Sequence, residues 1–201
     1  MNSQRKPLEP VHLSAGRLYL RPLIPADEAA VGEALRDPGV ARWNVGLAIL
    51  AAPESQRATM WLRVREQGWV TGTSTHFAVT DATTGELLAS VGIRDINRMP
   101  QQALASYWTM PAARGRGIAA QALDVLCRWA FGSPEAGGLG LHRISLDHAL
   151  INTASCRVAE KAGFQYEGVM RGSFVDHEGN RYDSHLHARL ATDQFPPTSA
   201  S

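Results

Sequence analysis

The chain has 201 residues, a formal net charge of +1, and a composition that is 44% hydrophobic and 19% charged. This length suits one domain with a sizeable core, and the balance of residues is typical of a folded globular protein. The near-neutral charge gives no overall attraction to nucleic acid or to an anionic membrane, so we expect neither as a partner. No apolar window approaches the length of a membrane span.

The first half of the chain is expected to form a strand, two helices and three strands. Alternating apolar residues predict the first strand over 16–23, and helices are expected over 26–37 and 53–68. The segment 39–50 between these helices has no clean period. From residue 75 the period changes to two, so 75–81 and 87–96 predict an antiparallel hairpin, followed by a strand over 103–110.

The second half alternates helices and strands. A helix follows residue 117, a glycine-rich loop covers 132–141, and a strand is expected over 142–150. Asn152 caps a short helix that Gly163 ends, and strands over 164–172 and 181–190 close the chain. This order predicts one α+β domain with a mixed, mostly antiparallel sheet. The strands on either side of the first of these helices should be parallel neighbours, joined by a right-handed crossover.

Two arginines and two glycines alternate in Arg114-Gly115-Arg116-Gly117, directly before that helix. A strand, a glycine turn and a helix N-terminus together form a common binding site for phosphate, because free N–H groups and the helix dipole favour an anion. The P-loop pattern is absent, since no Gly-Lys-Ser/Thr follows. The dinucleotide fingerprint also fails, because Ala120 replaces its third glycine and the segment follows an antiparallel hairpin.

Two sequence blocks resemble the GNAT acetyltransferase superfamily. Residues 114–119, RGRGIA, match its Gln/Arg-x-x-Gly-x-Gly/Ala signature for the pyrophosphate of acetyl-CoA. Residues 152–171, NTASCRVAEKAGFQYEGVMR, resemble the Asn-x-x-Ser…Gly-Phe…Glu-Gly block of the RimJ/RimL-type N-terminal acetyltransferases. The resemblance spans 18–190 and implies a GNAT fold, with the sheet flanked by helices and splayed at its parallel strand pair.

The resemblance also implies a set of site residues. Acetyl-CoA would lie along the strand before the glycine turn and bind its pyrophosphate to the turn itself, with contacts from Trp108, Thr109, Met110, Arg114, Gly115, Arg116, Gly117, Ile118, Ala119, Asn152, Ser155 and Lys161. Ser155 would protonate the departing thiolate, and the Met110 N–H would stabilise the oxyanion. The alternative for Ser155 is a first-turn hydroxyl that bonds its own backbone near the Asn152 cap.

No residue stands out as the general base. Relatives place a glutamate a few residues beyond the Glu-Gly pair, but here Phe174 lies near that position. Glu167 reads as structural, His148 as a core histidine, and residues 176–178 as a solvated hairpin tip. A strong base is not required for an α-amine, whose pKa of about 7.7–8.0 leaves much of it neutral near physiological pH.

Two further groups of residues are candidates for binding the acceptor or a metal. Trp43 and Asn44 lie in the segment that lines the acceptor side in relatives, so they are candidate substrate contacts. His185 and His187 share one face of a strand with Asp183, but no third ligand converges with them in the sequence. We therefore expect no metal.

The cysteines point to direct transfer in a reducing compartment. Cys127 and Cys156 form no CxxC or Cys/His motif, which favours a cytoplasmic location and argues against a disulfide scaffold. Neither has a basic environment in the sequence, and on the helix Cys156 points about 100° away from Ser155. We therefore expect no acyl-enzyme.

The sequence thus predicts an acetyl-CoA-dependent N-acetyltransferase in one domain, with residues 1–14 as an N-terminal extension, 15–191 as the GNAT domain and 192–201 as a flexible tail. The favoured acceptor is a peptide or protein N-terminal amine. A small-molecule acceptor, such as an antibiotic or polyamine, stays open, as does a CoA-binding module without turnover. Homodimerisation is also left open, because many relatives pair.

Overall fold

The structure is a computed structural model that describes residues 6–194. Its centre is an eight-stranded sheet with the strand order β1-β2-β3-β4-β5-β6-β8-β7. Neighbouring strands are antiparallel except β5 and β6, which are parallel. This sheet confirms the predicted α+β fold. The strands are β1 (Leu13–Ala15), β2 (Leu18–Pro22), β3 (Thr75–Asp81), β4 (Leu87–Arg94), β5 (Gln102–Thr109), β6 (Arg143–Ala149), β7 (Gln165–Val175) and β8 (Arg181–Leu190).

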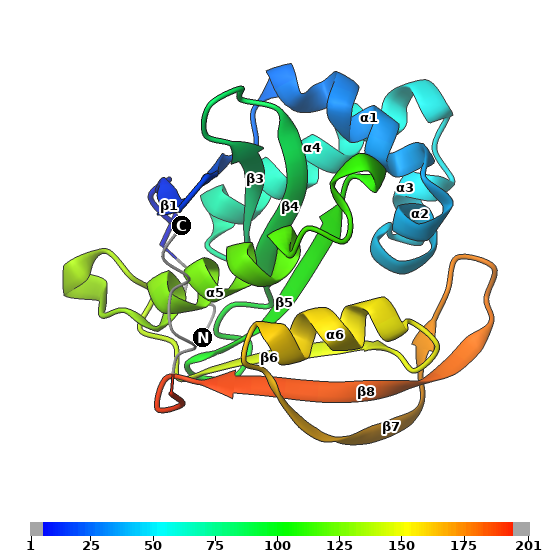
Figure 1. The fold of residues 1–201 in the computed structure, drawn as a ribbon. Coiled ribbons are helices and arrows are strands. Elements are labelled where there is room, and N and C mark those ends of the chain that lie inside the picture. The colour runs from blue at the N-terminus through cyan, green and yellow to red at the C-terminus, as the bar shows by residue number, and fades with distance from the viewer. Residues whose placement is uncertain (1–5, 195–201) are drawn as a thin grey trace.

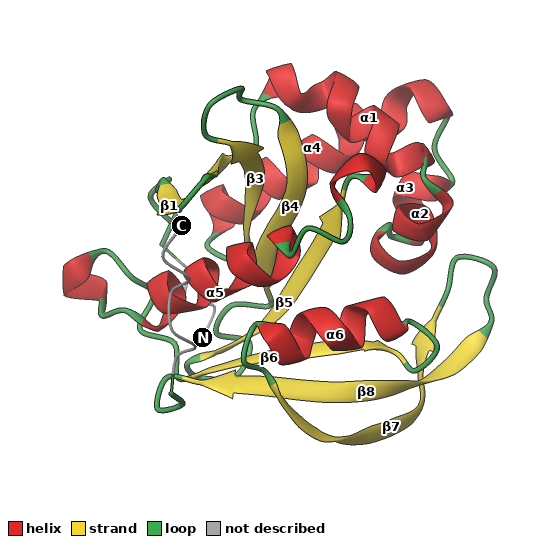
Figure 2. Ribbon diagram, viewed as in Figure 1, coloured by secondary structure: helices red, strands yellow, loops and turns green. Residues whose placement is uncertain are grey.

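Helices cover both faces of the sheet (Figures 1 and 2). The helices on one face are α5 (Ile118–Phe131) and α6 (Thr153–Lys161). Those on the other face are α1 (Glu28–Arg36), α2 (Pro38–Asn44), α3 (Leu47–Leu50) and α4 (Glu54–Thr71). Short 3₁₀ turns cover Pro25–Asp27, Pro111–Ala113 and Pro134–Ala136.

Two neighbouring residues of β3 show how the layers pack. The ring of His76 contacts Trp61 of α4, with centroids 6.4 Å apart. The ring of Phe77 points to the opposite face and contacts Trp129 of α5 at 5.6 Å. Because successive side chains of a strand alternate between faces, Trp61 of α4 and Trp129 of α5 lie on opposite sides of the sheet. The last turn of α4 also reaches the Phe77 ring, through Trp69 at 5.2 Å.

The parallel pair of strands is joined only at one end. Gln102–Leu104 of β5 pairs with Arg143–Ser145 of β6, and beyond this point no pairing continues. β5 runs on to Thr109 and β6 to Ala149, so the strands separate and leave a gap in the middle of the sheet. This arrangement confirms the prediction of parallel neighbours that splay apart.

The segment 39–50 is where the predicted elements differ most from the structure. It was expected to be irregular, but it contains most of α2 and all of α3. Asp37 begins α2 by accepting a hydrogen bond from the N–H of Val40, and Pro38 occupies the first turn. Helices of four and seven residues are too short to show an apolar period, which explains why the sequence pattern missed them.

The described ends of the chain pack against the domain. β1 pairs with β2 from Leu13 onward, and the Leu8 N–H donates to the carbonyl of Trp69, so the sheet begins before the predicted boundary at residue 15. At the other end the Asp193 carboxylate accepts from the N–H of Leu190. Most of the predicted tail, residues 195–201, lies outside the described part of the chain.

Candidate active site

A cavity of about 950 Å³ opens where β5 and β6 separate. Strand β5 contributes residues 105–109 to its wall, and β6 contributes residues 146–149. Further lining comes from the turn before α5, the inner side of α6, helices α2 and α4, strands β3 and β4, and the tip of the β7–β8 hairpin. A ligand in this cavity therefore touches elements from both halves of the chain.

The cavity has two sides, because the gap passes through the sheet. Leu104 of β5 pairs with Ser145 of β6, so Ser106, Trp108 and Asp147 share the face that α4 covers. Tyr107 and His148 point to the opposite face, toward α6. We call the first the α4 side and the second the α6 side of the cavity.

The turn before α5 presents a row of free backbone donors. Gly115 and Gly117 have φ of 76° and 77°, in the left-handed region that glycine adopts without strain. The N–H groups of residues 115–120 donate no hydrogen bond within the part of the chain that the structure describes. All these residues except Arg116 also line the cavity. The turn therefore has the geometry of an anion site at a helix N-terminus.

The two arginines of this turn differ in position, because Arg114 lines the cavity and Arg116 does not. The Arg114 side chain forms an ion pair with Asp37 at 2.5 Å, and its backbone N–H donates to Pro111. Arg116 lies beside a separate shallow pocket with Arg17 and Asp81. The free donors that this turn offers to an anion are its backbone amides, and the charge of Arg114 is shared with Asp37. Two further positive side chains that line the cavity, Arg157 and Lys161, come from α6.

The predicted oxyanion donor is wrong. The Met110 N–H donates to the carbonyl of Leu88 at 2.9 Å, so it is already used in the sheet. Hydrogen-bonding groups alternate along a strand, so those of Trp108 also face β4, whereas those of Tyr107 and Thr109 face the open edge. A ligand that lies along β5 meets these two residues' backbone groups.

Ser155 faces the cavity and is hydrogen-bonded to Tyr107. Its Oγ lies 2.5 Å from the Tyr107 hydroxyl oxygen, and either hydroxyl can be the donor. The tyrosine oxygen also lies 3.1 Å from the Ser155 carbonyl, so its single proton goes either to that carbonyl or to the Ser155 Oγ. Asn152 caps α6 as predicted, with its side-chain oxygen accepting from the Ser155 N–H, and it also lines the cavity. Burial raises the pKa of Tyr107, so its hydroxyl stays protonated. Tyr107 was missed in the sequence because its partner lies 48 residues away.

The α4 side of the cavity is cationic. Arg65 and Arg94 line it together with His76 and the carboxylate of Asp147. The second carboxylate of the cavity, Asp176, is paired with Arg42 of α2. Burial lowers the pKa of Arg65 to about 10, with a further contribution from the charge of Arg94. The Arg65 Nε has no hydrogen-bond partner among the described residues, and nor has the indole N–H of Trp108. Burial also lowers the pKa of His76, which keeps that ring neutral.

Trp43 and Asn44 line the cavity, on the last turn of α2 and not in an irregular segment. The Trp43 ring contacts Phe174 at 5.6 Å and Tyr182 at 6.2 Å, and the Arg42 guanidinium stacks on Trp43 at 4.4 Å. These contacts join α2 to the β7–β8 hairpin. They close one end of the cavity with segments that are far apart in the sequence.

The acidic candidates for a general base differ in burial and in their position relative to the cavity. Glu167 is structural, because it forms an ion pair with Arg143 that lowers its pKa, and it does not line the cavity. Asp176 was expected to be solvated, but it is 1% exposed and its oxygens accept hydrogen bonds from Asn180 and Tyr182. Asp147 lines the cavity, and the sequence pattern did not identify it as a candidate.

The expectation of no metal assumed that no third ligand converges with His185 and His187, and this assumption is wrong. His148, on β6, and Cys156, on α6, converge with His185 and His187 on β8, and one ligand atom from each lies within 4.8 Å of the others. Cys156 therefore has basic neighbours that the sequence did not show. Burial and nearby Glu160 nevertheless raise the pKa of its thiol, so the thiolate needed for an acyl-enzyme is not favoured.

Comparison with known proteins identifies the fold and the family. The family model described as Acetyltransferase (GNAT) domain matches residues 17–165. The chain is 34% identical over 110 residues to the probable N-acetyltransferase YjcK of Bacillus subtilis, covering 51% of this chain and 58% of that protein. The match thus spans little more than half the length of this curated relative. The same holds for a second B. subtilis protein, the uncharacterized N-acetyltransferase YoaA.

Solved structures agree over nearly the whole chain. Mycobacterium smegmatis RimJ in complex with CoA-disulfide superimposes with a TM-score of 0.76 at 24% identity, covering 95% of this chain and 93% of that one. The ribosomal-protein-S5-alanine acetyltransferase of Vibrio fischeri has a TM-score of 0.70 at 21% identity, covering 92% and 100%. These similarities show the fold. Together with the family match, they show that this chain belongs to the GNAT acetyltransferase family. Within residues 6–194, no helix has both the length and the apolar character to span a membrane.

Proposed function

We propose that this protein is an acetyl-CoA-dependent N-acetyltransferase whose acceptor is the N-terminal amine of a peptide or protein. The observation that carries the proposal is the cavity between β5 and β6. It joins a row of unpaired backbone N–H groups at residues 115–120 to the Ser155–Tyr107 pair, and it continues to the α4 side of the sheet. Donor and acceptor therefore approach each other from opposite sides of one gap.

The α6 side fits acetyl-CoA. Free amides at the start of α5 suit a pyrophosphate, and Arg157 and Lys161 add positive charge nearby. The unpaired edge of β5 at Tyr107 and Thr109 suits the amide groups of the pantetheine arm, which would extend the sheet as a short extra strand. The Ser155 hydroxyl lies beside this edge, close to the expected position of the sulfur.

The residues of the gap support direct transfer. The acceptor amine attacks the thioester carbonyl, and a backbone N–H at the open edge of β5 stabilises the oxyanion. The Thr109 N–H takes the role predicted for Met110. Ser155 gives its proton to the departing thiolate, while the buried Tyr107 hydroxyl holds the Ser155 oxygen in place. The attacking nitrogen loses its proton to water as it becomes an amide, and water returns a proton to Ser155.

The acceptor class rests on the α4 side. Asp147 supplies a carboxylate for an ammonium group, and Arg65 supplies a cation for an acidic group nearby. The other charges at this end are paired within the protein, Arg94 with Asp95 at 2.7 Å and Asp176 with Arg42 at 3.4 Å. A peptide N-terminus followed by an acidic residue carries both charges, whereas a polyamine or an aminoglycoside carries only positive ones. This charge pattern supports a peptide acceptor over those molecules. A cytoplasmic location and pairing into a homodimer remain predictions from the sequence.

The test is release of free CoA thiol from acetyl-CoA with a panel of acceptors. Peptides with an acidic, neutral or basic second residue are compared with aminoglycosides and polyamines, and mass spectrometry locates the acetyl group. We expect turnover with peptides, a preference for the acidic ones, and loss of that preference in Arg65→Met. Turnover with small amines only would overturn the acceptor class.

Two further outcomes of the same assay separate the alternatives. If CoA raises the melting temperature but no acceptor releases thiol, the protein is a CoA-binding module without turnover. If neither CoA nor acetyl-CoA raises the melting temperature, the donor site is refuted, because a ligand of the folded state must stabilise it.

A further inference from the structure

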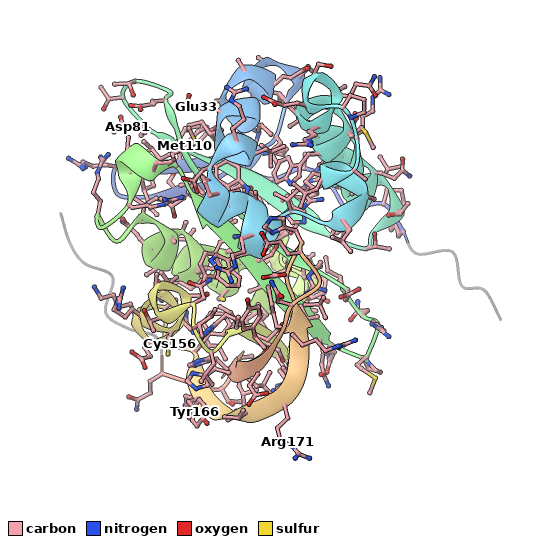
Figure 3. All side chains as sticks on the ribbon, turned by 90° about the vertical axis from the view of Figure 1, so that its right-hand side faces the viewer. Glu33, Asp81, Met110, Cys156, Tyr166 and Arg171 are labelled. Carbon is pink, nitrogen blue, oxygen red and sulfur yellow. The ribbon has the colours of Figure 1, made fainter. Side chains whose placement is uncertain are left out.

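Three histidines and one cysteine meet between α6 and the sheet, and one of the histidines, His148, also lines the cavity. We call this group the histidine–cysteine cluster; its members are His148, Cys156, His185 and His187. The Cys156 Sγ lies 3.7 Å from the His185 Nδ1 and 3.9 Å from the His187 Nε2. Figure 3 shows Cys156 near Tyr166 of β7, whose ring contacts His185 at 5.0 Å and so covers the cluster.

The strand register brings the histidines together. His148 of β6 lies directly opposite His185 of β8, and His187 follows two residues later on the same face. The His148 and His187 rings stack with centroids 5.3 Å apart. Three strongly polar rings thus share a mostly buried space, where each ring nitrogen requires a partner.

The hydrogen bonds of the cluster leave ring nitrogens unused. The His148 Nδ1 bonds to the carbonyl of Ala149 at 3.0 Å, while its Nε2 is buried and has no hydrogen-bond partner within the described residues. A ring whose Nδ1–H donates to a backbone carbonyl is fixed in the tautomer that offers its Nε2 lone pair. Metal-binding histidines commonly have this arrangement.

The distances are close to those of a tetrahedral zinc site. Zinc bonds of about 2.0–2.1 Å to nitrogen and about 2.3 Å to sulfur place neighbouring nitrogen and sulfur ligands about 3.5 Å apart. The observed sulfur–nitrogen separations of 3.7 and 3.9 Å exceed this by a few tenths of an ångström. No ligand atom is more than 4.8 Å from another, so small side-chain rotations close the site.

We propose that the histidine–cysteine cluster binds one zinc ion through three imidazole nitrogens and one thiolate. On binding, the Cys156 thiol loses its proton to solvent and its sulfur bonds to the metal, so no oxidant or reductant is needed. Soft sulfur together with imidazole selects zinc over magnesium or calcium, which prefer oxygen ligands. The site ties α6 to β6 and β8. The ion would take no chemical part in the proposed transfer reaction.

The test uses Co²⁺ as a spectroscopic substitute for zinc in the full chain without a polyhistidine tag. After chelation and dialysis under reducing conditions, we expect one equivalent of Co²⁺ to give the visible bands of a tetrahedral ion and a thiolate-to-metal charge-transfer band. Zinc should then remove both spectra by displacement. Absence of these bands in the unaltered protein would overturn the proposal.

Matched variants locate the site. Cys156→Ser should remove the charge-transfer band and weaken binding at least about 100-fold, since even residues that only support ligands change affinity 10–100-fold. His142→Gln, which changes an exposed histidine outside the cluster, should behave as the unaltered protein. If Cys156→Ser does not fold, His185→Gln replaces it, because that side chain is only partly buried.

A thermal measurement provides a second readout that does not depend on activity. Zinc should raise the melting temperature of the unaltered protein and of His142→Gln, and should leave that of the ligand variant unchanged. Equal shifts in all three proteins, or a charge-transfer band that persists in Cys156→Ser, would show adventitious binding and refute the site.

Discussion

The hydrogen bond between Tyr107 and Ser155 should have a measurable role in the release of CoA. Ser155→Ala removes the proposed proton donor, and Tyr107→Phe removes only the hydroxyl that holds the Ser155 oxygen at 2.5 Å. If the Tyr107 hydroxyl acts only by positioning the Ser155 hydroxyl, Tyr107→Phe should not lower kcat further in a protein that already carries Ser155→Ala. The two single variants and the double variant form a double-mutant cycle that tests this.

The magnitudes follow from the chemistry of the leaving group. A positioned general acid contributes about 10²–10⁴-fold, and a thiolate, whose parent thiol has a pKa of about 8.5, needs the least assistance. We therefore expect Ser155→Ala to lower kcat about 100-fold, or about 2.7 kcal/mol. Tyr107→Phe should cost about one net hydrogen bond, roughly 0.5–1.5 kcal/mol. The double variant should match Ser155→Ala alone.

The assay is steady-state thiol release at saturating acetyl-CoA with the preferred peptide. CoA affinity and melting temperature serve as controls, because a loss of either would mean that α6 has moved. Effects that multiply in the double variant would show that the hydroxyls act independently and refute the positioning role of Tyr107. A larger loss in Tyr107→Phe than in Ser155→Ala would make Tyr107 the donor.

Three further changes have defined outcomes. Because the acceptor amine must be neutral, kcat/KM for a peptide should rise with pH and level off above a pH of about 8. The Asp147→Asn variant should show the same pH profile. A lysine side chain, whose pKa is about 10.4, should react roughly 300-fold more slowly than the peptide amine near neutral pH. Glu167→Gln should cost at most about 1 kcal/mol in urea unfolding at neutral pH, since the pair with Arg143 is partly exposed. That hydrogen bond lowers the pKa of Glu167 in the folded state from 4.5, so its stabilisation is present above pH 4.5 and disappears as the pH falls through the lowered pKa. Arg189→Met should destabilise the fold by about 3 kcal/mol in the same measurement, because Arg189 is fully buried and pairs with Asp124 at 2.8 Å.

The sequence was sufficient wherever the signal is local. The glycines at 115 and 117 indicated left-handed backbone before a helix, and Asn152 indicated the start of α6; both features are present in the structure. The change of period at residue 75 indicated the antiparallel strands, and their order along the chain indicated the parallel pair. These features depend on backbone preference and on alternation, which neighbouring residues determine.

The sequence was insufficient wherever two distant segments must meet. Arg114 was expected to bind an anion, but it pairs with Asp37, 77 residues earlier in the chain. Met110 was expected to offer its amide, but the register of β4 and β5 decides which amides are free. Asp176 was expected to be solvated and is buried against Tyr182. In each case tertiary pairing takes up a group that the local pattern leaves available.

Helix α6 connects the two chemical centres of the molecule through adjacent residues. Successive side chains of a helix point about 100° apart, so Ser155 faces the cavity while Cys156 faces the histidines of β6 and β8. Among the nine residues of α6, only Ala159 is classed as fully buried, so apolar packing alone holds the helix weakly. A metal bound at Cys156 would fix the rotation of α6 about its axis and its position along that axis, and so the position of Ser155. Since a displacement of about 1 Å at a reacting group costs on the order of 100-fold in rate, the proposed zinc site would support transfer without touching either substrate.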